Sequence, residues 1–279
     1  MAGRQPTLAI VQVGDRPDSN IYIRNKANFG QEIGVKVILE KLETGGLKDL
    51  ETKEKIIRSI ERFSEDKEVD GIIVQLPLPQ NIDVEEIVNS IPKSKDADGL
   101  VSRTALDTED SLVVTPATAR AVLALLDHYE VMISGKRVAV IGRSKLAGGP
   151  IAQVLSERGG EVTACHRGME KSEIIDICKK SDILVSAAGE AGLVTKDFVN
   201  EKQVVVDVGI NQPHPSLRVD PLLVKGRERH TNPSLPKIVG DVAFAEVEPL
   251  VAAITPVPGG VGPLTVACLF ENLLDLVAK

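Results

Sequence analysis

Tyr22 and Lys26 are the residues of this chain whose types and spacing most directly suggest acid–base chemistry. They are four positions apart in a segment whose pattern predicts a helix, so both side chains share one helical face. An amine beside a phenol could act as an acid–base pair. The ordinary alternative is a surface lysine that packs its stem along the tyrosine ring.

Further polar residues follow a predicted strand at Gly71–Val74. Gln75 comes directly after it, which places an amide side chain where a parallel strand ends, and Leu76 and Pro77 continue into a proline-rich turn. A second turn at 92–100 contains acids, among them Asp98. This context favours the acid–base interpretation of the pair.

The segment Thr255–Pro263 combines three prolines with three glycines and has no ionisable side chain. Proline restricts φ, whereas glycine reaches conformations closed to other residues, so the composition predicts one tightly bent backbone path. Such a path can bring main chain close to a ligand. A rigid loop that caps the last helix is the structural alternative.

A glycine-containing turn at 142–150 lies between an apolar strand and a predicted helix. Gly142 and Gly148 are six positions apart, so the turn is longer than the usual G-x-G-x-x-G fingerprint. Free N–H groups and the helix dipole still suit phosphate binding there, with Gly142, Arg143 and Ser144 as contacts. A purely structural turn is the alternative.

The end of the next strand, at 165–168, has no carboxylate to bind the adenine ribose of NAD. Arg143 and Arg167 could instead pair with a ribose phosphate, so the sequence favours NADP over NAD. Two solvated surface arginines are the alternative. Small residues at the ends of the two following strands leave room for a nicotinamide ring, and we expect cofactor contacts from Ala188, Gly189, Gly209 and Ile210.

Alternating apolar strands and helical segments must position these residues. In the first half we predict strands at Thr7–Val13, Lys36–Leu39 and Gly71–Val74, and helices after an N-cap at Ser19, at Asp49–Ser64 and at Val84–Ile91. In the second half we predict strands at 137–142, 161–164, 182–186 and 204–207, and helices at Ala117–Glu130 and Leu264–Lys279.

This pattern predicts a two-domain α/β fold. An N-terminal α/β catalytic domain would comprise residues 1–119 with 264–279, and a Rossmann-like doubly wound parallel sheet would comprise residues 120–263. The helix at 117–130 would bridge them. A long loop at 212–237 is expected to be a lid, an oligomer contact or a tolerated insertion.

Composition excludes several classes of function. Aromatic residues make up 3% of the 279 residues, tryptophan is absent and the net charge is −7, which argues against nucleic-acid binding. We expect no membrane segment and no export leader, hence a cytoplasmic protein. The three cysteines suit reduced thiols, and the four histidines have no metal-ligand spacing, so no metal site is predicted.

Seven motifs together resemble those of the bifunctional methylenetetrahydrofolate dehydrogenase/methenyltetrahydrofolate cyclohydrolase family, in the same order and over nearly the whole chain. They are Tyr-x-x-x-Lys, Gly-Ile-Ile-Val-Gln-Leu-Pro-Leu-Pro, Lys-Asp-Ala-Asp-Gly, Gly-Arg-Ser with a later Gly-x-Pro, Asp-Val-Gly-Ile-Asn, Gly240-Asp241-Val242 and Thr-Pro-Val-Pro-Gly-Gly-Val-Gly-Pro. The loop at 212–237 is longer than this resemblance leads us to expect.

The resemblance implies oxidation of methylene-tetrahydrofolate with NADP, and then hydrolysis of the methenyl product to formyl-tetrahydrofolate in the same cleft. It implies that Lys26 exchanges protons with the folate centre and that Gln75 orients it. A lysine with a lowered pKa in a dry cleft suits this task. Tyr22 would support the folate rings and Asp98 would hydrogen-bond the pterin. It also suggests a homodimer.

Other substrate contacts are expected from Leu76, Pro77, Pro256, Gly259 and Gly260. Because Thr255–Pro263 has no ionisable group, it should shape the folate side of the cleft rather than transfer protons. Three rivals stay open: a monofunctional dehydrogenase, a non-enzymatic NADP-binding sensor and an unrelated two-domain oxidoreductase acting on a small acid. The Pro-Gly segment is the feature that the last of these does not explain.

Overall fold

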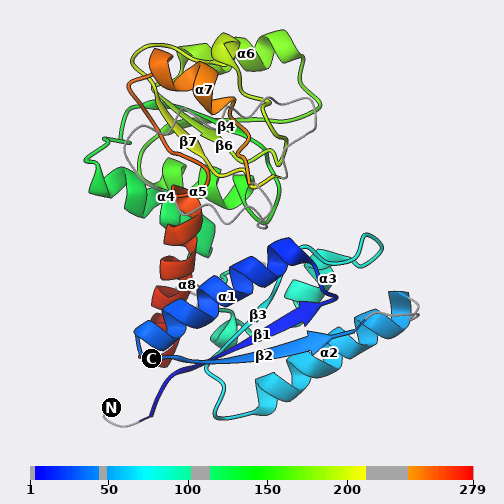
Figure 1. The fold of residues 1–279 in the computed structure, drawn as a ribbon. Coiled ribbons are helices and arrows are strands. Elements are labelled where there is room, and N and C mark those ends of the chain that lie inside the picture. The colour runs from blue at the N-terminus through cyan, green and yellow to red at the C-terminus, as the bar shows by residue number, and fades with distance from the viewer. Residues whose placement is uncertain (1–3, 44–48, 102–113, 212–237, 279) are drawn as a thin grey trace. The chain divides into compact units, whose positions relative to one another are not determined.

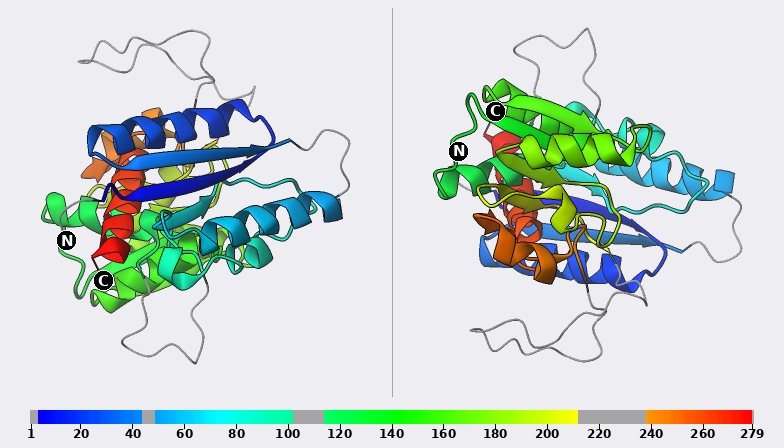
Figure 2. Two further views of the ribbon diagram at one scale, coloured as in Figure 1. Left: turned by 90° about the horizontal axis from the view of Figure 1, so that it is seen from below. Right: turned by 90° about the horizontal axis from the view of Figure 1, so that it is seen from above.

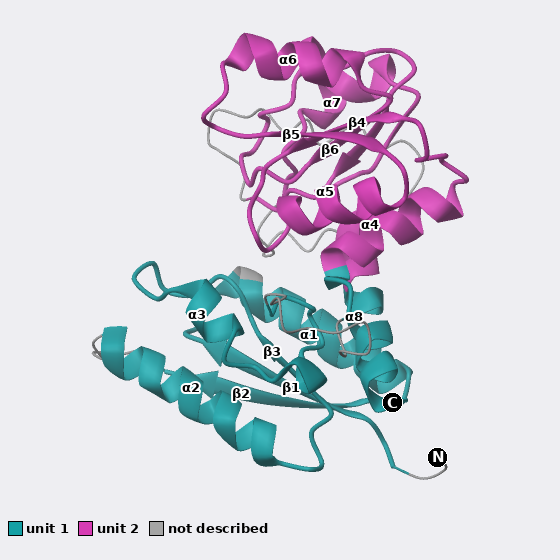
Figure 3. Cartoon of the chain, turned by 180° about the vertical axis from the view of Figure 1, so that it is seen from behind, with its two compact units in different colours: residues 1–117, 266–279 teal, residues 118–265 magenta. Residues whose placement is uncertain are grey.

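The computed structural model describes residues 4–43, 49–101, 114–211 and 238–278 (Figures 1 and 2). The chain divides into two compact units, which we call unit 1 (residues 1–117 and 266–279) and unit 2 (residues 118–265), coloured teal and magenta in Figure 3. Each contains a parallel sheet with helices, so the predicted α/β class is confirmed. Which ligand each unit binds stays a prediction.

In unit 1, the described strands form a parallel sheet in the order β2–β1–β3. These strands are β1 (Thr7–Val13), β2 (Lys36–Leu42) and β3 (Gly71–Val74). The central strand β1 is buried along its whole length, as its continuous apolar run predicts. The helices are α1 (Pro17–Glu32), α2 (Asp49–Glu65), α3 (Val84–Val88) and most of α8 (Val261–Val277), with a 3₁₀ turn, η1 (Lys93–Lys95).

Helices cover both faces of this sheet. The chain crosses from β1 to β2 in one direction and from β2 to β3 in the other, so right-handed crossovers place α1 and α2 on opposite faces, as Figure 2 shows. On the α2 face, Ile56 and Ile60 pack with Ala9 and Val11 of β1. On the other face, a Cβ added at Gly71 would lie 2.5 Å from Leu273 of α8, so glycine permits the close packing of this helix.

In unit 2, the described strands form a parallel sheet in the order β5–β4–β6–β7–β8. They are β4 (Arg137–Ile141), β5 (Glu161–Cys165), β6 (Ile183–Ser186), β7 (Val204–Asp207) and β8 (Ala253–Ile254). The helices are α4 (Ala117–His128), α5 (Gly148–Glu157), α6 (Lys171–Lys180) and α7 (Phe244–Val247), with 3₁₀ turns at Lys196–Phe198 and Glu248–Leu250.

The strand order of unit 2 reverses at β4, which pairs with β5 on one side and β6 on the other. Such a reversal opens a crevice at the carboxyl ends of the strands, where doubly wound sheets bind their ligands. The glycine-containing turn at 142–148 follows β4 directly, so it lies at this point. The predicted Rossmann-like arrangement is therefore confirmed as a fold.

The structure corrects several predicted boundaries. Ser19 is not the N-cap of the first helix, because α1 begins at Pro17 after Arg16, and proline is favoured in a first turn where its missing N–H costs nothing. Helix α3 ends at Val88, three residues before the prediction. Helix α4 ends at His128, two residues before the predicted end. Glu130 has a φ of 54°, which is incompatible with a right-handed helix.

Three further differences concern short or polar segments. Strand β2 continues to Leu42, three residues beyond the prediction. Its last residues alternate between exposed and half-buried positions, so they do not form the apolar run on which the prediction was based. The two-residue strand β8 was not predicted, and α8 begins at Val261 rather than Leu264. The predicted loop at 212–237 lies outside the described residues.

Within the described part of the chain, no helix has the length and apolar character needed to span a membrane.

Candidate functional site

Lys26 and Gln75, which are far apart in the sequence, meet in unit 1. The Lys26 Nζ on α1 donates a hydrogen bond to Gln75 Oε1 at 3.0 Å. The Gln75 backbone N–H donates to the Val11 carbonyl at 2.9 Å, so the residue extends the β3 ladder. Its Nε2 donates to the Leu76 carbonyl at 2.8 Å. Since this bond uses the amide nitrogen, the amide oxygen is the atom that faces the lysine.

The surroundings of Lys26 shift its proton affinity. The side chain keeps part of its surface exposed, yet burial of the amine lowers the pKa of Lys26, and the negative charge of Asp98 opposes this effect. Burial likewise raises the pKa of Asp98, opposed by the positive charge of Lys26. For both groups burial is the larger influence. The amine can therefore lose its proton more readily than an ordinary lysine.

Asp98 lies on a turn held by another acid, Asp96. The Asp96 carboxylate accepts the backbone N–H of Gly99 at 3.0 Å and that of Val101 at 2.7 Å. Burial raises the pKa of Asp96 to about 6. Gly99 has a φ of 71°, and an added Cβ would lie 2.9 Å from Pro116. Glycine is thus required at this turn, and Asp96 is a supporting residue to which the sequence analysis gave no role.

The other residues predicted for this half of the site lie nearby along the same elements. Tyr22 is half-buried on α1, one turn before Lys26. Leu76 is half-buried and Pro77 is exposed, and the peptide bond between them is cis. Their contacts with a substrate stay predictions.

The turn after β4 requires both of its predicted glycines. Gly142 has a φ of 106°, and an added Cβ would lie 2.4 Å from the Ala187 carbonyl oxygen. A Cβ at Gly148 would lie 2.1 Å from the carbonyl oxygen of Gly142. Ser144 and Arg143 are exposed on this turn. Its tight backbone and the following helix α5 fit the phosphate-binding role, which stays a prediction.

Arg167 has an acidic neighbour that the sequence did not reveal. It follows β5 with 87% of its side chain exposed, and its Nη2 lies 3.8 Å from Glu190 Oε2. An ion pair this long and this exposed contributes little, so the guanidinium could exchange it for a phosphate. Arg143 is also exposed. Two accessible arginines fit the extra phosphate of NADP.

Small residues follow β6 and β7 as expected, and two buried acids, Asp207 and Asp241, hold the backbone there. Ala188 and Gly189 each donate a backbone N–H to Asp241, at 2.7 and 3.2 Å. A Cβ at Gly209 would lie 2.1 Å from Asp241 Oδ1, so glycine is required there. Ile210 is 48% exposed. Burial raises the pKa of the second acid, Asp207, to about 6.

Asp207 and Asp241 both belong to motifs visible in the sequence, but no function was predicted for either. A usable signal was present, because Asp207 ends an apolar run two residues before Gly209 and Asp241 directly follows Gly240. That pattern is typical of carboxylates that cap tight backbone turns.

The Pro-Gly segment in unit 2 follows the tight path that its composition predicts. Thr255 is buried, and its Oγ1 accepts the Asp207 N–H at 2.8 Å. Gly259 is exposed with a φ of 115°, and Gly260 is buried. Pro256 is exposed. The described contacts explain the backbone shape, while substrate binding by Pro256, Gly259 and Gly260 stays a prediction.

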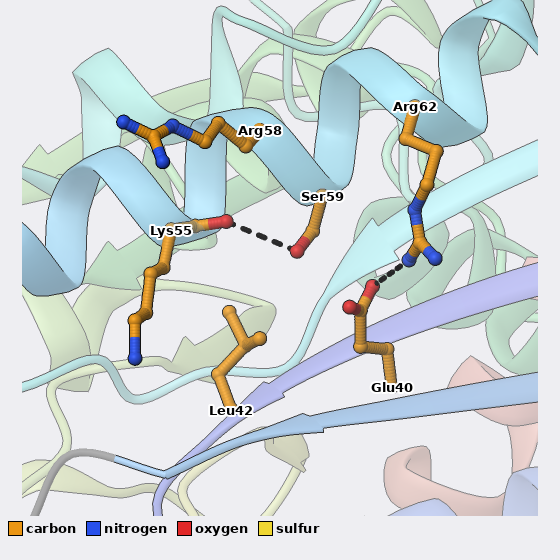
Figure 4. Close-up of a pocket in the computed structure, with 6 residues that line it drawn as sticks. All are labelled: Glu40, Leu42, Lys55, Arg58, Ser59 and Arg62. Carbon is orange, nitrogen blue, oxygen red and sulfur yellow. Dashed lines mark hydrogen bonds and ion pairs between the residues drawn. The ribbon is translucent and has the colours of Figure 1, made fainter.

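A surface hollow of about 350 Å³ lies elsewhere in unit 1, between α2 and β2 (Figure 4). Its lining residues include basic groups, but Arg62 pairs with Glu40 and Ser59 donates to the Lys55 carbonyl at 3.0 Å. The hollow is on the α2 face of the sheet, whereas Lys26 extends from α1 on the opposite face. It contains none of the predicted site residues, so we do not assign it a function.

Two family models match different parts of this chain. The family model described as tetrahydrofolate dehydrogenase/cyclohydrolase, catalytic domain, matches residues 1–98, and the model of the NAD(P)-binding domain of the same family matches residues 116–279. The bifunctional protein FolD of Methanospirillum hungatei is 40% identical over 275 residues, which are 98% of this chain and 88% of that protein.

Solved structures of the same family are similar to this chain over nearly its whole length. The bifunctional FolD methylenetetrahydrofolate dehydrogenase/cyclohydrolase of Campylobacter jejuni matches with a TM-score of 0.82 and 34% identity, over 99% of this chain and 89% of that chain. The Trypanosoma brucei methylenetetrahydrofolate dehydrogenase-cyclohydrolase, complexed with NADP and an inhibitor, matches with a TM-score of 0.82 and 35% identity, over 99% and 88% of the two chains.

Proposed function

This chain belongs to the tetrahydrofolate dehydrogenase/cyclohydrolase family, and on that premise we propose that it oxidises methylene-tetrahydrofolate with NADP and hydrolyses the methenyl product to formyl-tetrahydrofolate. Unit 1 binds the folate and carries the proton chemistry, and unit 2 binds the cofactor. The observation that supports the chemistry best is the hydrogen bond of Lys26 to Gln75, together with the lowered pKa of this lysine near the negative charge of Asp98.

The hydrolytic step needs a group that moves protons near neutral pH. Water adds its oxygen to the electrophilic methenyl carbon, a carbon–nitrogen bond of the bridge breaks, and one proton is released. The Lys26 amine accepts a proton from the water and returns one to the nitrogen that leaves, which its lowered pKa permits. Gln75 holds the amine at 3.0 Å and fixes its direction.

The oxidative step depends on binding and orientation by unit 2. When bound, NADP supplies the acceptor for the hydride that leaves the methylene carbon. The turn containing Gly142, Arg143 and Ser144 and the guanidinium of Arg167 would hold its phosphates. The glycines of that turn and the accessible arginines fit such a group. Ala188, Gly189, Gly209 and Ile210 would border the nicotinamide.

Replacing Arg167 by alanine should reduce the affinity for NADP and leave that for NAD unchanged. A charge-assisted hydrogen bond to phosphate contributes about 1.5–3 kcal/mol, so we expect NADP to bind about 10-fold more weakly or worse. Fluorescence titration with each reduced cofactor measures this. Arg158→Ala is the matched control, because Arg158 pairs with Asp127 instead. A preference for NAD that Arg167→Ala leaves unaltered would remove the assignment of NADP to this arginine.

The proposed function is tested by mixing purified protein with methylene-tetrahydrofolate and either NADP or NAD. Reduced nicotinamide and the methenyl chromophore are followed separately. Reduced cofactor without accumulating methenyl product supports both activities, provided that added methenyl-tetrahydrofolate also disappears faster than without protein. Equal accumulation of both indicates a monofunctional dehydrogenase. Cofactor binding without turnover indicates a sensor.

The family resemblance also supports two finer parts of the proposal. We propose that the chain acts as a homodimer and that it works in the cytoplasm, in one-carbon metabolism.

A further inference from the structure

Asp241 is a carboxylate with no exposed surface, although it belongs to a segment to which the chemistry above gives no role. Among the described residues, five donors point at it. Its Oδ2 accepts Ser186 Oγ at 3.1 Å and the backbone N–H groups of Ala188 at 2.7 Å and Gly189 at 3.2 Å. Its Oδ1 accepts the Glu190 N–H at 2.9 Å and Asn211 Nδ2 at 2.8 Å.

These donors come from the turns that leave β6 and β7. Three of them are consecutive backbone N–H groups, 188 to 190, which wrap around one carboxylate. Bonds to a charged acceptor are stronger than neutral ones, so the carboxylate fixes the path of this turn. Asn211 ties the second turn to the same point. Asp241 thereby joins the two backbone segments expected to border the nicotinamide.

Asp241 is itself held by the other buried acid. The Asp207 carboxylate accepts the backbone N–H groups of Asp241, Val242 and Gly209, each at 2.9 Å. The residue before Asp241 must be glycine, because a Cβ at Gly240 would lie 1.9 Å from Asp207 Oδ2. The position of the Asp241 carboxylate is therefore determined from both sides.

We propose that Asp241 is a positioning residue for the cofactor: its carboxylate holds the turns at 186–190 and 207–211 in the shape that NADP requires. The inference rests on the proposed function, and on the rule that doubly wound sheets bind dinucleotides at the carboxyl ends of their strands. Asp241 acts through Ala188, Gly189 and Gly209 and does not contact the reacting atoms.

The Asp241→Asn variant tests this with almost no change in shape. An amide has one acceptor oxygen, so whichever way it turns, either Glu190 and Asn211 or Ser186, Ala188 and Gly189 face an NH₂ group. We expect the affinity for NADPH and the KM for NADP each to worsen about 10-fold or more. The KM for folate and the hydrolysis of methenyl-tetrahydrofolate, which consumes no cofactor, should stay within about 2-fold.

The matched control is Asp182→Asn at the amino end of β6, where the carboxylate accepts the Arg137 N–H at 2.9 Å. It weakens the same sheet away from the expected cofactor site, and NADPH affinity should be unchanged. If Asp241→Asn does not fold, Ser186→Ala removes one donor and should weaken NADPH binding by about 3-fold.

Each outcome decides the inference. Weaker NADPH binding with hydrolysis retained supports it. Unchanged binding overturns it, and so does an equal loss of binding, hydrolysis and thermal stability, which indicates a structural role alone. Direct titration with NADPH keeps the test valid if the unmodified protein does not oxidise folate, in which case the proposed function fails and the binding comparison still stands.

Discussion

We expect the Lys26→Met variant to lose hydrolysis of methenyl-tetrahydrofolate, with a fall in kcat of about 10²-fold or more, the usual contribution of a positioned acid–base group. Methionine keeps the unbranched shape of the side chain and removes the amine. Gln75 Oε1 then loses the donor at 3.0 Å, and the folate centre loses its proton carrier. NADP affinity should be unchanged, because the predicted cofactor contacts belong to unit 2.

The pH dependence offers a second readout of the same residue. Burial lowers the pKa of Lys26, so the limb of the rate profile governed by this amine should lie below the ordinary lysine value. That limb should be absent from any residual rate of Lys26→Met. Lys55→Met is the matched control, since Lys55 is exposed on α2 at the other face of the sheet. Hydrolysis retained by Lys26→Met would remove Lys26 from the mechanism.

The fold class was predictable because it follows from local patterns. Apolar runs such as Thr7–Val13 and residues 204–207 do become buried parallel strands. The sequence also indicated glycines that a close approach of the backbone requires, as at Gly142 and Gly148. Boundaries were less predictable where packing decides them. The strand β8 has two residues, too few for any periodic signal.

The contacts of the site depend on pairs far apart in the sequence. Lys26 and Gln75 are separated by 49 positions, and spacing alone could not show that they meet. The resemblance to a known family suggested the pair. It suggested nothing about Glu190 beside Arg167, or about Asp241 beneath Ala188, because the sequence records residue types and not which donors reach an acid. Side-chain partners of this kind are set by the tertiary fold.

The Pro-Gly segment provides the second large effect: we expect Gly259→Val to impair folate use more than NADP affinity. Gly259 has a φ of 115°, which a β-branched residue rarely adopts, so valine must displace the backbone around it. A displacement of about 1 Å near a reacting centre can cost about 10²-fold in rate. We therefore expect kcat/KM for folate to fall by about that factor, measured in both steps, with NADPH titration beside it.

Gly260→Val reaches the same segment by a different physical route. An added Cβ would lie 2.7 Å from the Pro256 carbonyl oxygen and 2.9 Å from Thr255 Cβ, so it pushes on the buried threonine. Thr255 accepts the Asp207 N–H, and this variant should therefore also disturb the cofactor side to some degree. Gly259→Val acts instead through the φ of 115° at its own position, so the two variants disturb the segment by independent routes.

Gly262→Val is the control for both, because beyond its own helix and chain neighbours no described atom lies within 4 Å of the added Cβ. It changes the same segment without forcing a backbone shift, so both activities should persist. If Gly259→Val lowers folate use and NADPH affinity equally, while Gly262→Val does neither, the segment acts as a rigid loop that supports α8. A selective loss of folate use instead requires main chain at Gly259 close to the substrate.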